Sequence, residues 1–67
     1  MMRVVVNGVS REFPAAISVT GLVAALELAG KRIAIEHNGQ IVPRSRYADT
    51  ALADGDSLEV VVAVGGG

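Results

Sequence analysis

The chain of 67 residues has no cysteine and no tryptophan, and Phe13 and Tyr47 are its only aromatic residues. The lack of cysteine excludes disulfide bridges, Cys-ligated zinc and iron–sulfur clusters. A domain of this size buries only about 60% of the surface that its unfolded chain exposes, so it needs a dense aliphatic core. Hydrophobic residues make up 51% of the sequence and permit such a core. The length allows one domain.

The sequence also has no excess of basic residues. Six Lys and Arg stand against seven Asp and Glu, which gives a formal net charge of -1. Arg44 and Arg46 are the densest basic spot, and they are too few for a nucleic-acid footprint. No apolar run approaches the roughly 18 residues of a membrane span, and residues 1–8 lack the apolar stretch of a signal peptide. We therefore expect a cytoplasmic protein that binds neither nucleic acid nor membrane.

Residue patterns typical of catalysis, metal binding or cofactor binding are missing as well. His37 is the only histidine, and alone it makes neither a catalytic triad nor a zinc site. Asp54 and Asp56 lack the spacing of an EF-hand and are expected to form a turn through Asx hydrogen bonds. No glycine-rich phosphate-binding motif is present. The sequence therefore predicts no catalytic residue, no metal site, no cofactor and no enzymatic activity of its own.

The first part of the chain predicts a β-hairpin. Val4–Val6 is a β-branched run that stops at Asn7-Gly8, a dipeptide that favours the positive φ angles of a type I′ turn. Residues 9–13 are the expected returning strand. Pro14 ends it, because proline cannot donate a hydrogen bond to a neighbouring strand.

A helix is predicted next, over residues 19–29. Ser18 is a suitable N-cap, and Gly30, followed by two basic residues, is a typical stop signal. One apolar stripe at helical spacing comprises Val19, Leu22, Val23 and Leu26. After the helix we expect a strand over 33–37, an Asn-Gly turn at 38–39, a short strand at 41–42, a loop or short helical turn over 44–51, a turn at 54–56 and a last strand over 58–64.

This order of elements predicts a two-layer α+β domain over residues 1–64. One helix packs on one face of a mixed sheet of about four to five strands. Residues 65–67 are expected to form a flexible glycine-rich tail.

Apolar residues interrupt the expected alternation of the strands. In the last strand, one face carries Leu58, Val60, Val62 and Val64, and the other carries Glu59, Val61 and Ala63. Val61 and Ala63, together with Val5 in the first strand, put apolar side chains on the face expected to be solvated. They are either tolerated surface residues or a patch that docks a partner. Arg44 and Arg46 are likewise either a solvated loop or a contact with an acidic partner surface.

Three glycines, Gly65, Gly66 and Gly67, end the sequence. Without side chains they are suited to thread a narrow channel, and three extended residues reach at most about 10 Å. The reactive group there is the α-carboxylate of Gly67, which is ionised at neutral pH and must be activated before a nucleophile can attack it. The pattern therefore indicates a substrate that another enzyme modifies; a frayed end without a function is the alternative.

The chain resembles the ubiquitin-like β-grasp proteins, and among them the ThiS sulfur carriers of thiamine thiazole biosynthesis. The resemblance rests on Asn7-Gly8, Ser18-Val19, Asn38 to Arg44, Asp54-Gly55-Asp56 and Val64 to Gly67. It implies that a ThiF-type adenylyltransferase uses ATP to adenylate the Gly67 carboxylate. A persulfide from a cysteine desulfurase or sulfurtransferase then yields a thiocarboxylate, from which thiazole synthase takes the sulfur.

Two other functions stay open at this point. The small, sulfur-carrying subunit of molybdopterin synthase also ends in Gly-Gly, although it tends to be longer. A non-covalent β-grasp interaction module would have a dispensable tail. For a carrier that visits several enzymes, we expect a monomer when free.

Overall fold

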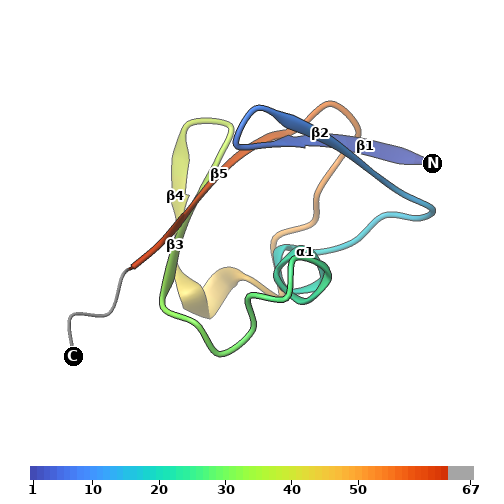
Figure 1. The fold of residues 1–67 in the computed structure, drawn as a ribbon. Helices are drawn as coiled ribbons and strands as arrows, with labels where there is room; N and C mark the ends of the chain where they lie inside the picture. The colour runs from blue at the N-terminus through green and yellow to red at the C-terminus, as the bar shows by residue number, and fades with distance from the viewer. Residues whose placement is uncertain (64–67) are drawn as a thin grey trace.

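The computed structural model describes residues 1–63, so the predictions for Val64 and for the three glycines lie outside the described residues. Within residues 1–63 the order of elements is the predicted β-β-α-β-β-β. The elements are β1 (Met2–Val6), β2 (Val9–Phe13), α1 (Val19–Ala25), β3 (Ile33–His37), β4 (Gln40–Val42), the 3-10 turn η1 (Arg44–Arg46) and β5 (Ser57–Val62) (Figure 1).

The strands form one mixed sheet in the order β2-β1-β5-β3-β4. Both hairpins are antiparallel, β5 runs parallel to β1, and β5 runs antiparallel to β3. The last strand of the chain is therefore the central one, with a hairpin on each side. Helix α1 lies across one face of the sheet, which we call the inner face; the opposite one is the outer face (Figure 1). The predicted fold class is confirmed.

The first hairpin turn has the predicted geometry, since Asn7 and Gly8 have φ angles of 51° and 81°. The Asn7 side chain also makes contacts that the dipeptide does not predict. Its Oδ1 accepts a hydrogen bond from the Val60 N–H at 2.7 Å, and its Nδ2 donates to the Val60 carbonyl at 3.0 Å. The turn thereby extends the pairing between β1 and β5 beyond the end of β1.

Helix α1 begins as predicted but ends at residue 25 rather than at residue 29. Glu27 has a left-handed φ of 60°. Its N–H donates to the Ala24 carbonyl, and the Leu28 N–H donates to the Val23 carbonyl, both at 3.0 Å. This is a Schellman motif with Glu27 at the position that glycine usually takes. The predicted stop at Gly30 was wrong because the apolar Leu28, which packs against the core, closes the helix earlier.

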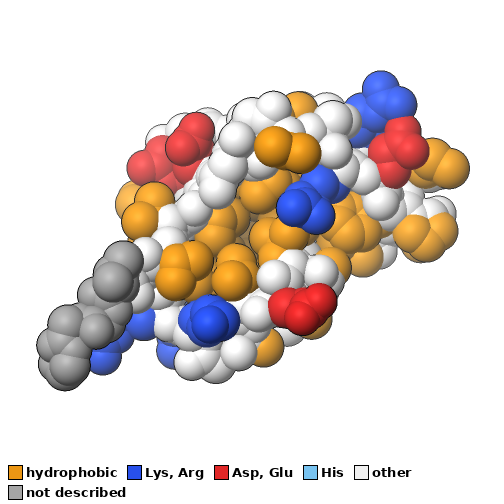
Figure 2. Space-filling model, in the orientation of Figure 1, with side chains coloured by type: hydrophobic (Ala, Val, Ile, Leu, Met, Phe, Trp, Pro, Cys, Tyr) orange, Lys and Arg blue, Asp and Glu red, His pale blue; other side chains and the backbone are white. Residues whose placement is uncertain are grey.

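The short helix leaves part of the inner face uncovered. Val62 shares the inner face with Leu58 and Val60, which are buried, yet it is 41% exposed. Figure 2 shows hydrophobic side chains gathered around a hollow on this side of the molecule. The last strand also ends earlier than predicted, at Val62, so Ala63 lies just beyond β5.

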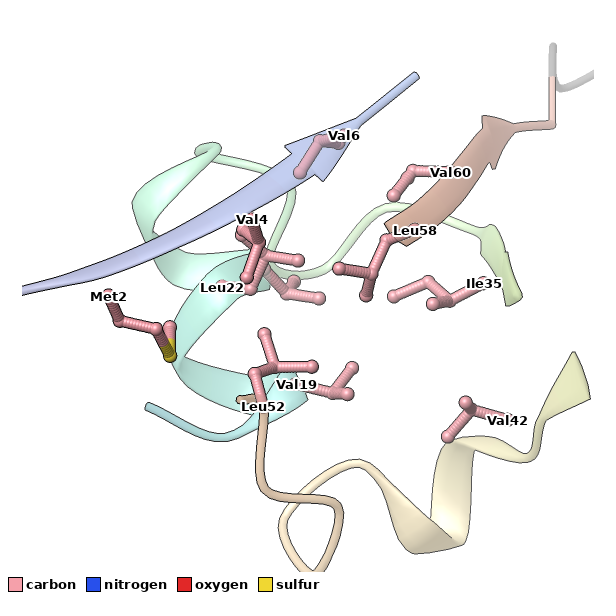
Figure 3. Packing of buried hydrophobic residues seen from close by; sticks show 11 residues of the cluster. Met2, Val4, Val6, Val19, Leu22, Ile35, Val42, Leu52, Leu58 and Val60 are labelled. Atoms are coloured by element: carbon pink, nitrogen blue, oxygen red, sulfur yellow. The ribbon is translucent and has the colours of Figure 1, made fainter. Parts of the chain in front are cut away.

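The core is aliphatic, as the composition predicts (Figure 3). It is built from alternate residues of β1 and β5 and from one stripe of α1, and Leu22, Ile35 and Leu58 are almost completely buried. The complete cluster comprises Met2, Val4, Val6, Val19, Leu22, Val23, Ile35, Val42, Leu52, Leu58 and Val60. Phe13 and Tyr47 only pack against its edge. Among the described residues, no helix has the length and apolarity that crossing a bilayer requires.

Candidate functional site

The predicted site centres on Gly65, Gly66 and Gly67, which lie outside the described residues. What the structure does give is the point from which the chain continues toward them. Beyond β5, the Ala63 N–H donates to the Arg32 carbonyl at 2.8 Å. The end of β5 lies at the opposite end of the molecule from the N-terminus (Figure 1). The strand that leads toward the glycines is therefore hydrogen-bonded up to residue 63 on the side of β3.

Two of the predicted docking residues, Val61 and Ala63, lie near this end on the outer face. Val61 is 62% exposed and pairs with Ala34 of β3. Ile41 of β4 is 68% exposed, and its pairing with Glu36 puts it diagonally across the hairpin from Ala34. We call Ala34, Ile41, Val61 and Ala63 the outer patch. Sequence analysis missed Ile41, although its register opposite the polar Glu36 marks it as outward-facing.

Val5 does not join the outer patch. It is half-buried and pairs with Ser57, at the beginning of β5. Four residues of strand, roughly 13 Å, separate Ser57 from Val61, and Glu59 lies between them on the outer face. The structure thus brings together Val61 and Ala63 and leaves Val5 apart.

The two arginines predicted to contact a partner, Arg44 and Arg46, lie at different places on the surface. Arg44 Nη2 donates to the Lys31 carbonyl at 3.3 Å, and both residues line a cavity of about 300 Å³. Arg46 instead lines a separate cavity of about 200 Å³ beside His37. Because the Arg32 carbonyl binds Ala63, a basic cluster of Lys31, Arg32 and Arg44 flanks the end of β5. The ion pairs within residues 1–63 are Arg3–Glu12 and His37–Asp56, so none of them uses this cluster.

His37 belongs to a hydrogen-bond network that joins the β3–β4 hairpin to the turn before β5. Its Nε2 lies 2.6 Å from Asp56 Oδ2, which also accepts the Ala53 N–H at 2.8 Å, and Asn38 Nδ2 donates to Asp56 Oδ1 at 3.1 Å. Burial alone raises the pKa of Asp56, but the hydrogen bonds from His37, Ala53 and Asn38 outweigh it, so this pKa lies below its ordinary value. Asn38 Oδ1 in turn accepts the Ser57 N–H at 2.8 Å.

The hydrogen bonds that hold the turn at 54–56 are not the predicted Asx bonds. Asp54 Oδ1 accepts the Arg3 N–H at 2.7 Å, and the Gly55 N–H donates to the Arg3 carbonyl at 2.7 Å. Asp56 bonds backward to Ala53. Asp54 thus bonds the turn to β1, and Asp56 bonds it to the preceding residues. The turn preferences of the sequence predict neither contact. Within residues 1–63, no group of three or more His, Asp or Glu is placed to hold a metal ion.

Comparison with known proteins decides the family. Residues 4–67 match the family model described as the ThiS family. The chain belongs to the ThiS family. A crystal structure of the thiamine biosynthesis protein ThiS from Geobacter metallireducens has a TM-score of 0.83 and 32% identity, and the match covers 98% of this chain and 100% of that one. The ThiS-type β-grasp fold that the sequence predicted is therefore confirmed.

Proteins similar to this chain differ in length. The sulfur carrier protein ThiS of Bacillus subtilis is 36% identical over 50 residues, which is 75% of this chain and 76% of that protein. A thiazole synthase of Paramagnetospirillum magneticum is 44% identical over 66 residues, and one of Magnetococcus marinus is 33% identical over 66 residues. The chain spans 20% of the length of each thiazole synthase.

Proposed function

We propose that the chain is a sulfur carrier in thiamine biosynthesis and that it is a co-substrate of other enzymes, not a catalyst. The observation that carries this proposal is the family match over residues 4–67, which includes the three glycines. Similarity to the Bacillus sulfur carrier over three quarters of both chains supports it.

In the proposed reaction the Gly67 α-carboxylate attacks the α-phosphorus of ATP on a ThiF-type adenylyltransferase, and pyrophosphate leaves. A persulfide sulfur then attacks the acyl carbon, and AMP leaves with the electron pair of the broken C–O bond. A thiol cleaves the resulting acyl disulfide, becomes oxidised to a disulfide, and leaves a thiocarboxylate on Gly67. A cysteine desulfurase or sulfurtransferase supplies the persulfide, and thiazole synthase consumes the thiocarboxylate.

The described residues suit this role. The central position of β5 anchors the strand that leads to Gly65, Gly66 and Gly67, and three extended residues reach up to about 10 Å from the body. Exposed Val61 and Ala63 offer an apolar contact at the same end, and Arg44 offers positive charge that would steer an acidic partner surface.

Thiazole synthase is the receiver that the comparisons favour over molybdopterin synthase. Two thiazole synthases contain a segment similar to almost the whole of this chain. When a carrier-like segment and a thiazole synthase lie in one polypeptide, we expect the synthase to accept the sulfur that the segment carries. We keep the expectation of a cytoplasmic monomer that visits its partners in turn.

Intact mass spectrometry tests the proposal. The protein is incubated with a ThiF-type adenylyltransferase, ATP and a persulfide source. We expect one oxygen to be replaced by sulfur. Deletion of Gly67 should abolish the mass change, because the chain then ends one residue short of the reacting position, and should leave the circular dichroism spectrum unchanged.

An unchanged mass, under conditions in which another ThiS protein is modified, would contradict the carrier function. If the protein nevertheless bound its partners, the non-covalent interaction module would be the better description.

A further inference from the structure

An apolar groove lies on the inner face beside the end of β5. It has a volume of about 330 Å³. We call it the β5 groove; its apolar lining comprises Val6, Val9, Leu26, Leu28, Val60 and Val62. Val9 and Val62 are 56% and 41% exposed, so the groove opens to solvent. It exists because α1 ends at residue 25 and does not cover this part of the sheet.

One edge of β5 is open along the same groove. The N–H and carbonyl of Val60 point toward Asn7, whose side chain binds both. Backbone groups alternate in direction along a strand, so those of Val62 point to the same side as those of Val60. The chain has by then turned away at Asn7-Gly8, and no other strand of residues 1–63 lies on that side. On the other side Val61 pairs with Ala34.

A strand edge beside an apolar groove is suited to bind an extended peptide. The main-chain groups of an added strand pair with the edge, and alternate side chains enter the groove. Arg11 also lines the groove, and neither ion pair of residues 1–63 involves it. The site therefore fits an extended segment with an aliphatic side chain and a nearby carboxylate.

We propose that the β5 groove docks such an extended segment of thiazole synthase, which pairs with the open edge at Val62. This inference rests on the proposed function. The occurrence of a similar segment within two thiazole synthases favours this partner. The position favours it too, because a strand held at Val62 lies where the chain continues toward Gly67. Glycines have no side chains that a partner could recognise. A partner must therefore bind backbone N–H and carbonyl groups, such as those at the open edge of Val62.

Binding of the full chain to purified thiazole synthase, measured by titration calorimetry, tests this docking. Val9→Ser and Val62→Ser should each weaken binding about tenfold, which is the effect of losing one buried aliphatic side chain. Val62→Pro removes the N–H of the open edge and should weaken binding at least as much, since proline is tolerated where a strand N–H has no partner strand. Arg11→Gln should reduce the dependence of affinity on salt.

Ala15→Ser is the control. It changes an exposed apolar side chain that belongs to neither the β5 groove nor the outer patch, and it should leave binding to the synthase within about twofold of the wild-type protein. Thermal unfolding of every variant checks that the domain is folded.

The docking proposal is overturned if the groove variants bind thiazole synthase like the unmodified protein, or if they lose affinity only for the adenylyltransferase. A loss at Ala15 equal to that at Val62 would also overturn it. The mass assay distinguishes failure of the docking proposal from failure of the carrier function. Groove variants that gain sulfur and bind thiazole synthase normally refute the docking proposal alone. If the wild-type protein never gains sulfur, the carrier function is refuted, whatever binding the calorimetry measures.

Discussion

The Asp56 carboxylate joins the turn before β5 to the β3–β4 hairpin. It accepts hydrogen bonds from Ala53 and Asn38 and lies against the His37 ring. These contacts favour its charged form, and its pKa lies below the ordinary value. Their contribution to stability is therefore complete above the unfolded-state pKa of about 3.9. It is lost as the pH falls through the lower, folded-state pKa.

We predict that Asp56→Asn lowers the free energy of unfolding at neutral pH by about 1–3 kcal/mol, because the hydrogen bonds lose their charged acceptor. The variant should also lose less stability than the wild-type protein as the pH falls below about 4. Urea unfolding over this pH range measures both effects. Asp49→Asn changes an exposed carboxylate and should behave like the unmodified protein; an equal loss in both variants would contradict the role of Asp56.

At the same scale, the sequence predicts backbone angles better than long-range contacts. Asn-Gly correctly predicts the positive φ angles of Asn7 and Asn38, because that preference is local. The bonds from these side chains to Val60 and Ser57 were not predicted. Their partners are 53 and 19 residues away, so they depend on a strand order that no dipeptide encodes.

At the scale of elements, the end of α1 has a non-glycine residue in the left-handed region. Glu27→Gly should raise the free energy of unfolding by about 0.5–1 kcal/mol, because glycine takes this φ without the steric cost of a Cβ. The melting temperature should rise by a few degrees, about 2–6 °C. Thermal and urea unfolding check this.

Glu27→Ala is the control for this change, because it removes the carboxylate and keeps the Cβ. It should give no gain in stability. If alanine stabilises the domain as much as glycine does, the carboxylate and not the backbone angle is the cause.

Element types were predicted correctly, whereas several boundaries, above all the end of α1, were not. Hydrophobic periodicity identified each strand and the helix because the core requires it. The helix end was misplaced because Leu28 packs against the core, a tertiary contact that outweighs the glycine signal at Gly30. The β5 groove is a consequence of that shorter helix, and the sequence therefore gave no indication of it.

At the scale of the molecule, the outer patch and the basic cluster lie at the end from which the chain continues toward Gly67. Val61→Asp should weaken binding to the adenylyltransferase about tenfold or more, since it puts a charge into an apolar contact. It should cost less than about 1 kcal/mol of stability, because Val61 is largely exposed. Calorimetry and urea unfolding separate the two effects; unfolding of the variant, or unchanged binding, would contradict the docking role.

Parity along β5 correctly predicted that Val61 faces solvent. It did not identify Ile41, because β4 has only three residues, which are too few to show an alternating pattern. Arg44 and Arg46, two residues apart, looked like one basic site in the sequence, yet they line different cavities. A 3-10 turn rotates residues two apart toward different sides, and the outcome depends on how η1 packs.

The position of β5 has a mechanical consequence. Tension applied to the chain beyond residue 63 pulls along the axis of a strand that is bonded to β1 on one side and β3 on the other. Such a load reaches the bond between Ala63 and Arg32 first. It shears several hydrogen bonds at once and does not peel them off one by one, and the two bonds from Asn7 to Val60 share it further along the strand. A partner enzyme that drew the glycines into a channel would therefore pull against hydrogen bonds that are loaded in shear.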